Sequence, residues 1–537
     1  MLKKILNSYF IFRLNKRFHF LDVYSIYKKE NNQIKKWYVK QMRFFRPETK
    51  KTVEGILLMQ MVQNYGYNIK MAAAAKVYCE ENNLEINFYD PYFTRRIGWI
   101  DPIRDLYEKY FKGGLYKAHL SFGKKMIFSC EDIFHDQSQV KSELKRIKKS
   151  INTIDDIFRI EIDNIIIGDL VYDTYLRYFK KPTLIDFKDL DLEKIIEISI
   201  NIFLSFQEIL KSYKIKCLFN SYTSYIAHGI VLRICLKNNI PVYIFGLDVG
   251  IIKKVEEDAP FNIQSYWVLS ENLNLSDEKL NLAKEQLESR FSGKIDSAVS
   301  YMRSSSFTER PLNPQIKSDF KINKRNVVIY AHDFYDQPHE NRCLQFHDLF
   351  QFLNVTLNNL VEIENTTIWV KVHPNSIEDS KELTIELVKK FKVDHFKLLD
   401  SSISNLNIVQ LKPDLIVTAR GTIALEMAYF EIPVVALYDN PFVNFSFTHT
   451  CYDLNSFYEI IKGNKMISVN YDKLNLYSFY YQSYIKDFEN VNMNLFNKLK
   501  SGSLPSFGEE FLVKIRNEKS LIFNNEILNN YKVYFNY

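Results

Sequence analysis

The sequence predicts an α/β protein with two doubly wound, parallel-sheet, Rossmann-like domains, and three observations support this prediction. The chain has 537 residues, which is too many for one ordinary hydrophobic core. Short apolar runs alternate with helical patterns in both halves, as is typical of parallel sheets covered by helices. Residues 412–438, KPDLIVTARGTIALEMAYFEIPVVALY, show this order most clearly, with a strand at 414–417, a break at 420–422, a helix and a second strand.

Changes in composition divide the chain into a basic aromatic arm, an N-terminal α/β domain, a helical connector, a C-terminal α/β domain and a C-terminal helical segment. In that order, the predicted bounds are 1–50, 51–255, 256–320, 321–465 and 466–537. The connector is placed by a charged helical stretch that loses its periodicity over 303–315. The last segment is aromatic and rich in Asn and Lys, and we expect its helices to pack back across the domains.

The first half alternates helical patterns with β-branched or aromatic runs, which predict strands. The predicted helices are 55–65, 71–79, 190–213 and 230–237, and the basic stretch 138–150 is a helix or a loop. The predicted strands are 84–89, 165–167, 216–220 and 241–245.

The second half continues this alternation. The predicted strands are 326–331, 367–372 and 396–399, with helices at 342–362 and 381–391 and a short element at 406–411. Ligands bind such sheets at the C-terminal ends of the strands, so we look for functional residues there.

The overall charge excludes a dedicated nucleic-acid binder. Lys and Arg number 71 against 64 Asp and Glu, a net charge of +7. The basic residues crowd residues 3–51 among aromatic ones, which suits an anionic membrane surface, although a solvated basic arm would have the same composition. The start of the chain matches neither a signal peptide nor a spanning helix.

The cysteines indicate the compartment. The six cysteines show no CxxC and no short metal-type spacing, which is typical of reduced thiols in the cytoplasm. We therefore expect a cytoplasmic protein whose membrane role, if it has one, is peripheral at the inner face.

Polar side chains follow three predicted strands of the C-terminal domain. They are His332, Asp336 and His339 after the first strand, Lys371 and His373 at the second, and Arg420, Gly421, Thr422 and Glu426 after the third. In a parallel sheet all three groups open onto the same edge, where loops carry ionisable residues. His373 is suited to hydrogen-bond a phosphate, or to act as an acid toward a leaving phosphate near neutral pH.

The turn at 420–422 is suited to an anion. Backbone N–H groups and the positive end of the following helix meet there, so a phosphate can be held without a dedicated cation. Gly421 would allow a close approach or a positive φ. Glu426 lies one helical turn after Thr422, so both can face the same crevice. An ordinary β-α-β unit, in which Gly421 only permits a tight turn, would give the same pattern.

Two carboxylates in the N-terminal domain are candidates for the acceptor side. Asp169, Asp173 and Arg177 recur at helical spacing after Gly168, which ends a predicted strand. An exposed, ion-paired helix face would have the same spacing.

A metal site is the alternative interpretation of His332, Asp336 and His339, which are suitable ligand types. No further acidic cluster completes a coordination shell, so we predict no metal. The sequence also lacks the phosphate-loop, dinucleotide-binding and nucleophile-elbow motifs.

The segment WVKVHPNS and the stretch 412–438 resemble the capsule and lipopolysaccharide surface-carbohydrate synthesis proteins with a GT-B-like fold, including the Kdo-transferase-like group. Those proteins pair a K-x-H-P loop with a G-T-x-x-x-E-A helix start and a G-x-P-V strand. The matching residues are Lys371, His373, Pro374, Gly421, Thr422 and Glu426. Met427 stands where alanine is usual and Glu431 where glycine is usual, and the resemblance covers roughly residues 160–445.

The resemblance implies a metal-independent glycosyltransferase of capsule or O-antigen synthesis. It would have no cofactor apart from its co-substrate, a nucleotide sugar such as a CMP-linked acidic sugar, and its acceptor would be a glycan or glycolipid. The donor would be held by Lys371, His373, Arg420, Gly421, Thr422 and Glu426. The catalytic candidates are Asp169, Asp173 and His373, with His332, Asp336 and His339 as further contacts to donor or acceptor.

Three other functions stay open. A nucleotide-sugar 2-epimerase-like isomerase uses the same two-domain frame, and a non-catalytic scaffold of polysaccharide assembly would keep the fold without turnover. CDP-glycerol glycerophosphotransferases share the His-Pro loop. They carry an aspartate and paired serines where this chain has residues 418–422, a departure that favours a sugar transferase.

Overall fold

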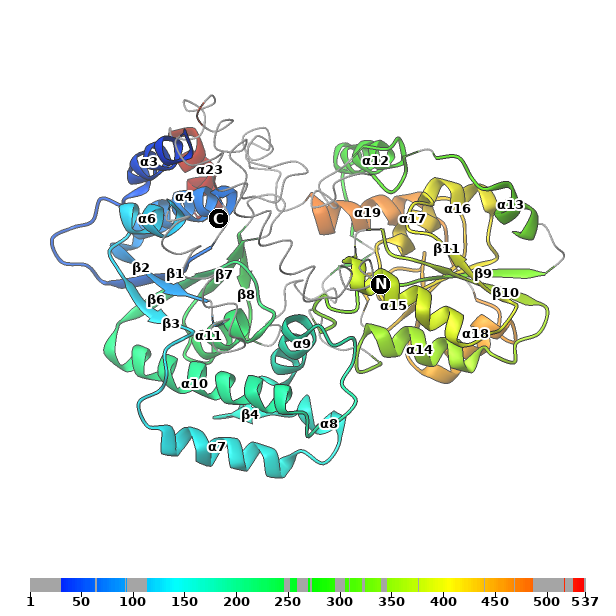
Figure 1. Ribbon diagram of the computed structural model, residues 1–537. Coiled ribbons are helices and arrows are strands. Elements are labelled where there is room, and N and C mark those ends of the chain that lie inside the picture. The colour runs from blue at the N-terminus through cyan, green and yellow to red at the C-terminus, as the bar shows by residue number, and fades with distance from the viewer. Residues whose placement is uncertain are drawn as a thin grey trace.

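The computed structural model contains two α/β domains that lie side by side (Figure 1). The structure describes residues 30–62, 65–91, 93, 114–245, 252–257, 269–270, 273–294, 305–308, 310–320, 324–339, 345–374, 376–438, 440–467, 469–485, 516 and 525–535. Over these residues each domain is built on one main twisted sheet of six strands, and the predicted fold class of two Rossmann-like domains is confirmed.

The first sheet has the strand order β3-β2-β1-β6-β7-β8. Its strands are β1 (Gly55–Gln60), β2 (Leu84–Asp90), β3 (Met126–Ser129), β6 (Ile215–Asn220), β7 (Val242–Phe245) and β8 (Ile252–Val255). The pairs from β3 to β7 are parallel, whereas β8 pairs antiparallel with β7. The chain builds outward from β1 to β3 and then returns to the other side of β1, so the strand order reverses between β1 and β6.

Helices cover both faces of the first sheet. They are α3 (Glu30–Met42), the short 3-10 helix η1 (Arg43–Phe45), α4 (Tyr65–Asn82), α6 (Gly114–Phe122), α7 (Gln137–Ser150), α8 (Ile154–Ile157), α9 (Gly168–Phe179), α10 (Leu190–Ser212), α11 (Ile226–Lys237) and α23 (Asn525–Phe535). A two-stranded antiparallel hairpin, β4 (Glu161–Ile162) and β5 (Ile165–Ile166), precedes α9. Gly168 opens α9 because a Cβ there would overlap the carbonyl oxygen of Ile157.

The second sheet is parallel throughout its described pairs, with the order β11-β10-β9-β12-β13-β14. Its strands are β9 (Arg325–Tyr330), β10 (Thr366–Lys371), β11 (Phe396–Leu399), β12 (Leu415–Thr418), β13 (Val434–Leu437) and β14 (His449–Cys451). Here the order reverses between β9 and β12. Successive residues of β9 enter the cores on opposite faces, with Val327 on one side and Val328 on the other.

The helices of the second domain are α12 (Asp277–Phe291), α13 (Pro314–Phe320), α14 (Leu349–Asn359), α15 (Glu378–Lys390), α16 (Asn405–Leu411), α17 (Ile423–Tyr429), α18 (Leu454–Lys462) and α19 (Lys473–Tyr484). α19 packs against α12 and α17, and α23 lies against α4 of the first domain. The C-terminal segment therefore contributes helices to both domains, as expected from the sequence.

One local prediction is wrong. Residues 55–65 were expected to form a helix, but β1 occupies 55–60, and every residue of this strand is buried. A strand buried on both faces has a continuous apolar run, which hides the two-residue period. The strand predicted at 165–167 is confirmed as β5, which belongs to the hairpin and lies outside the parallel sheet.

The second half of the predicted basic arm packs onto the first domain. Tyr38, Met42 and Phe45 of α3 and η1 are fully buried in its core, so this part differs from a solvated arm. The first 29 residues lie outside the described residues. Over the described ranges, no helix combines the length and the apolarity needed to cross a bilayer.

Candidate functional site

The three polar groups predicted after strands do meet at one edge of the second sheet. β10 and β12 flank β9 and both pair parallel with it, so the loops after all three strands leave from neighbouring positions. The reversal of strand order between β9 and β12 opens a crevice in such sheets, and ligands bind there. His332 follows β9 and Thr418 ends β12 on either side of this switch point.

The turn after β12 is tied to His332. The Thr418 hydroxyl lies 3.2 Å from His332 Nε2 and accepts a hydrogen bond from Gly421 N–H at 3.0 Å. A positive φ was one of the two reasons expected for a glycine at position 421, but Gly421 does not have a positive φ. A Cβ at Gly421 would lie 2.9 Å from Thr418 Oγ1 and 3.5 Å from His332 Cε1, so the turn itself leaves little room for a side chain, and the close approach of a ligand stays a prediction.

Arg420 connects the same turn to the loop after β9. Its Nη2 donates to the carbonyl oxygen of Gln337 at 2.9 Å. Burial lowers the pKa of His332 to about 3, with smaller contributions from Arg420 and His373, so His332 is neutral at pH 7. α17 is only seven residues long, so its dipole is weak, and the guanidinium of Arg420 is the stronger attraction for an anion.

The end of β10 carries a buried lysine, and the loop after it carries a partly buried histidine. Lys371 Nζ donates to the carbonyl oxygens of Val372 at 3.1 Å and Asp400 at 3.0 Å. Burial lowers the pKa of Lys371 to about 8, so most of the population stays charged at pH 7. Burial and then Lys371 lower the pKa of His373 to about 4. His373 is therefore neutral near pH 7, and the predicted role of a protonated acid does not follow from this structure.

Asp333 holds the β9 loop against the start of α15. Its carboxylate accepts hydrogen bonds from Tyr335 N–H at 3.0 Å and from Ile377 N–H at 2.9 Å. Ser376 Oγ donates to the carbonyl oxygen of His373 at 3.1 Å. These contacts fix the loops after β9 and β10 relative to each other.

Glu426 does not face an open crevice. It is buried on α17, where Oε1 lies 3.0 Å from Arg290 Nη1 of α12 and Oε2 accepts from Asn405 Nδ2 of α16 at 2.8 Å. Asn405 Oδ1 in turn accepts from the Tyr330 hydroxyl at 3.2 Å. Both oxygens of the carboxylate are occupied, so the predicted contact to sugar or ribose hydroxyls gives way to a structural ion pair.

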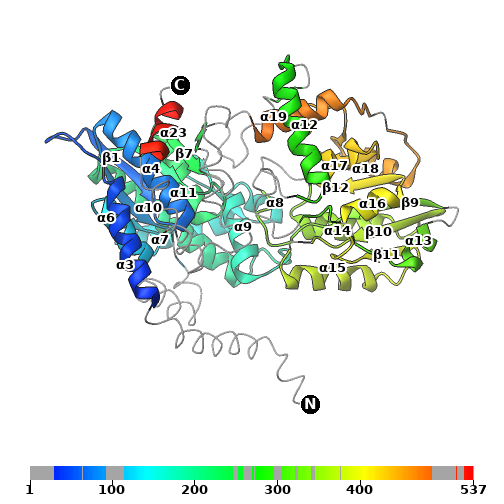
Figure 2. The ribbon, with the colours of Figure 1, turned by 90° about the horizontal axis from the view of Figure 1, so that it is seen from above.

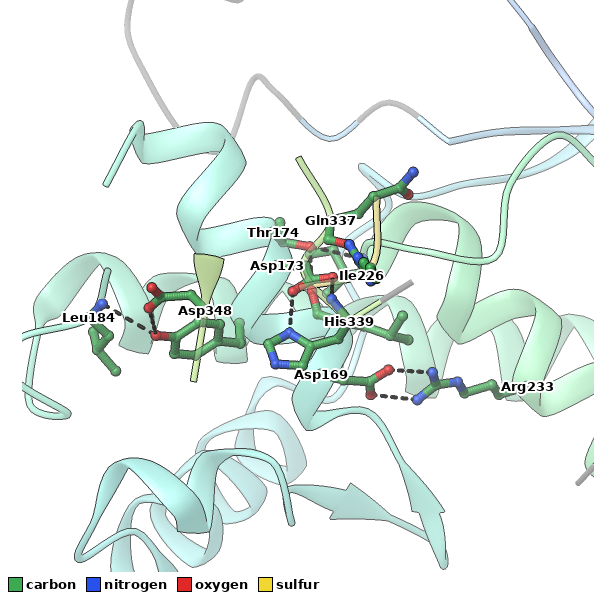
Figure 3. A network of polar contacts seen from close by, with 12 residues as sticks. Asp169, Asp173, Thr174, Leu184, Ile226, Arg233, Gln337, His339 and Asp348 are labelled. Carbon is green, nitrogen blue, oxygen red and sulfur yellow. Dashed lines mark hydrogen bonds and ion pairs between the residues drawn. The ribbon is translucent and has the colours of Figure 1, made fainter. Parts of the chain in front are cut away.

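Asp169 and Asp173 lie on α9 at the boundary between the domains (Figures 2 and 3). Arg233 binds both carboxylate oxygens of Asp169, at 2.7 and 2.5 Å. Burial alone would raise the pKa of Asp169, but this ion pair outweighs it and the pKa is lowered. Asp169 is thus unsuited to act as a base.

Asp173 has a different environment. Its Oδ1 lies 2.6 Å from His339 Nδ1, and Oδ2 accepts from His339 N–H at 3.2 Å. Burial raises the pKa of Asp173, and His339 offsets this only in part. Asp173 is therefore the better base of the two, although its side chain is buried against the second domain.

His332, Asp336 and His339 do not share a ligand position. His332 contacts Thr418, His339 contacts Asp173, and Asp336 lies 3.7 Å from Arg177 of α9. His332 makes its contact within the second domain, whereas His339 and Asp336 contact α9 of the first domain, and we assign the three no metal.

A group at the first sheet was missed by the sequence analysis. Gln60 ends β1 and contacts His228 of α11 and Ser221 after β6. A buried glutamine closing an apolar run would have been the signal for a strand end. The predicted helix at 55–65 hid it.

Comparisons with known proteins assign the chain to no family. Neither the family models nor the curated proteins include a match to this chain. Among solved structures, the chain is similar to the beta Kdo 2,4 transferase KpsC of Thermosulfurimonas dismutans, with 14% identity, a TM-score of 0.32, and 49% of this chain and 79% of that chain covered. The beta Kdo 2,7 transferase KpsC of the same organism gives 12% identity, a TM-score of 0.30, and coverage of 59% and 89%.

A third solved structure, a UDP-N-acetylglucosamine 2-epimerase, is similar at 14% identity and a TM-score of 0.21, with 81% of this chain and 91% of that chain covered. At these values the similarity assigns no activity to the chain.

Proposed function

We propose that the chain is a metal-independent glycosyltransferase that moves a sugar from a nucleotide-activated donor to a surface polysaccharide or glycolipid. The observation that carries this proposal is the convergence of three loops at the switch point of the second sheet. They bring together Lys371, His373, Arg420 and the backbone of Gly421, opposite α9 of the first domain.

In this proposal the donor phosphates lie at the turn after β12, beside Arg420 and the N–H groups around Gly421 and Thr422. Negative charge builds on the leaving phosphate as the glycosidic bond breaks. Arg420 and Lys371 would stabilise that charge, and such fixed electrostatic stabilisation is usually the largest contribution to catalysis. His373, neutral at pH 7, would donate a hydrogen bond to a phosphate oxygen.

The acceptor would bind to the first domain, with Asp173 removing the proton of its attacking hydroxyl. The raised pKa of Asp173 favours this role over Asp169. Because Asp173 is buried against His339, the acceptor can reach it only when this contact between the domains opens.

The first test is calorimetric titration of the full chain with CMP, CDP, UDP and GDP. We expect one of them to bind, and we expect Arg420→Ala to weaken that binding by roughly tenfold, about 1.4 kcal/mol. Arg159→Ala is the matched control, because this arginine is exposed on the first domain and, among the residues that the structure describes, its ion pair is with the nearby Asp156. Failure of the wild-type chain to bind any of the four nucleotides would refute the proposal.

A second variant tests the turn itself. Gly421→Val places a side chain against Thr418 and His332, so a folded variant should bind the nucleotide less well than wild type. Incubation with nucleotide sugar then separates the functions. Product that requires an added glycan indicates a transferase, isomerised donor without a glycan indicates an epimerase, and unchanged donor indicates a scaffold.

A further inference from the structure

The carboxyl edge of the first sheet carries a polar cluster that the proposed nucleotide site does not use. Gln60 ends β1, Asn220 ends β6 and Ser221 follows it, at the place where the strand order of this sheet reverses. His228, in the first turn of α11, completes the cluster. Gln60 is fully buried, whereas His228 is partly exposed. Such reversals are where ligands bind to open α/β sheets.

The backbone fixes the orientation of the Gln60 amide. Ser221 N–H and its hydroxyl both donate to Gln60 Oε1, at 2.7 and 2.6 Å. Because a backbone N–H can only donate, the oxygen of the amide must face Ser221 and its nitrogen must face His228. If the amide were inverted, its NH₂ group would face the backbone N–H of Ser221, and both groups can only donate.

This orientation fixes the tautomer of His228. Gln60 Nε2 lies 2.5 Å from His228 Nδ1. The amide nitrogen can only donate, so Nδ1 must accept, and the ring proton is on Nε2. A second ring proton at Nδ1 would point at the amide protons of Gln60. Burial also favours the neutral ring, because it lowers the pKa of His228 to about 4.

His228 can therefore donate a hydrogen bond but cannot act as a base near neutral pH. Its lone pair on Nδ1 is taken by Gln60, and its Nε2–H donates to no residue in the described part of the chain. A ligand at this position must supply an acceptor, such as a hydroxyl or carboxylate oxygen.

The loop that leads into α11, just before His228, is strained and held by side chains. Tyr225, directly before α11, has φ 64° and ψ 154°, a conformation that is rare for residues other than glycine. Thr174 Oγ1 accepts from Ile226 N–H at 3.0 Å, and Asn220 Nδ2 donates to the His228 carbonyl at 3.2 Å. Strained backbone of this kind persists where its surroundings fix it, and it clusters at ligand sites.

Arg177 adds a second donor near this loop. Tyr225 and Arg177 are close enough that the phenol helps to raise the pKa of the guanidinium. Arg177 makes no hydrogen bond within the described ranges, and its one ion pair there, with Asp336, is 3.7 Å long. Both Arg177 and His228 thus offer N–H groups, which favours an oxygen-rich ligand.

We infer that the switch point of the first sheet is a second ligand site, in which neutral His228 donates a hydrogen bond from Nε2 to an oxygen of a saccharide. Gln60 and Ser221 are positioning residues that set the tautomer of His228. The saccharide class rests on the proposed function, because the acceptor side of a sugar transferase needs such a site. The tautomer and the donor role rest on the geometry alone.

The tautomer is tested by NMR on the full chain with nitrogen-15-labelled histidine, assigned with the His228→Asn variant. We expect His228 to show the Nε2–H form and to stay neutral from about pH 5 to about pH 8, where ordinary histidines titrate. Gln60→Glu supplies a carboxylate that can accept from Nδ1–H, so it should move the proton to Nδ1 and raise the pKa of His228. An Nδ1–H form in the wild type, or titration within that range, overturns the inference.

The ligand is tested with two variants that copy different parts of the ring. His228→Gln places an amide near the position of Nε2, whereas His228→Asn places one near Nδ1, where it can still meet Gln60. Saturation-transfer NMR with glucose and with glucuronate at millimolar concentration should show binding to wild type and to His228→Gln, and a loss of most of the signal in His228→Asn. Equal signals in all three proteins, or none in the wild type, overturn the saccharide site.

Nucleotide titration of the same variants separates this inference from the proposed function. A folded His228→Asn protein should bind the nucleotide as wild type does, because His228 belongs to the other sheet. A wild-type chain that binds no nucleotide would refute the transferase, while the tautomer measurement would still decide the role of His228.

Discussion

Asp173 and His339 join the two domains through a buried contact of 2.6 Å between Oδ1 and Nδ1. Asp173 lies on α9, and His339 lies in the loop that follows β9 (Figure 3). The hydroxyl of Tyr172, the residue before Asp173, donates to Asp348 Oδ2 at 2.7 Å, and Asp348 caps α14. α9 is therefore an element of the first domain that is anchored in the second.

Removal of this contact should weaken the whole chain. In Asp173→Ala, His339 stays buried without its acceptor, so we expect the free energy of unfolding to fall by about 3 kcal/mol. Urea unfolding measures this change. Asp155→Ala is the control, because it breaks the exposed His347–Asp155 pair, where a loss of about 0–1 kcal/mol is expected. Equal losses in the two variants would contradict the anchoring role.

Glu426→Gln should reduce stability and leave nucleotide affinity unchanged. The substitution removes the charge that balances buried Arg290, and breaking such a pair costs about 3–5 kcal/mol, less where the amide still accepts one hydrogen bond. Thermal unfolding and calorimetric titration give the two quantities. Arg290→Met combined with Glu426→Leu should recover much of the loss, since an apolar pair leaves no buried charge. A stable Glu426→Gln protein with weakened binding of nucleotide sugar would restore the ligand role.

Stability should fall as pH falls below about 6.5. Burial lowers the pKa of His332 to about 3 and of His373 and His228 to about 4, against the usual value of about 6.5 in the unfolded chain. Between the folded and unfolded pKa values the unfolded chain binds more protons than the folded chain. The stability that these neutral histidines contribute is therefore fully present above about pH 6.5, and it is lost as pH falls toward their pKa values in the folded chain.

Denaturant unfolding from about pH 4 to about pH 8 measures how steeply the free energy of unfolding changes with pH. His373→Gln removes one of the three groups and should flatten it. His135→Gln serves as the control, because His135 is 72% exposed. An unchanged slope in His373→Gln would show that burial does not depress this pKa.

Two truncations should have different effects. Removal of residues 1–50 takes Tyr38, Met42 and Phe45 out of the first core, so we expect a loss of at least about 5 kcal/mol. Removal of residues 1–29 leaves all three in place. If the first 29 residues bind anionic membranes, this shorter truncation should keep its unfolding temperature and lose salt-sensitive binding to anionic vesicles. Vesicle binding equal to that of the full chain would exclude them as the membrane contact.

The sequence predicted the second domain closely because its strands and helices are marked locally. The strand expected at 396–399 is β11, and the break at 420–422 lies between β12 and α17. The convergence of three strand-end loops also followed from the local pattern, once the sheet was taken as parallel.

The partners of the site residues could not be predicted in this way. Glu426 pairs with Arg290, and Gln60 contacts His228 across the fold, between residues far apart in the chain. No periodicity encodes such pairs. Protonation depends on burial, so the neutral state of His373 also appears only once the fold is known.

The position of α23 has a consequence for synthesis on the ribosome. Ile527, Leu528 and Tyr531 are buried in the core of the first domain, and Phe535 stacks on Phe219 of β6. Domains made first usually fold first. Here the first domain has to wait for residues 525–535, whereas the stretch from α12 to α19, which forms the second domain, is already complete. Until residues 525–535 have been made, a nascent chain would thus leave exposed the apolar surface of α4 that α23 covers.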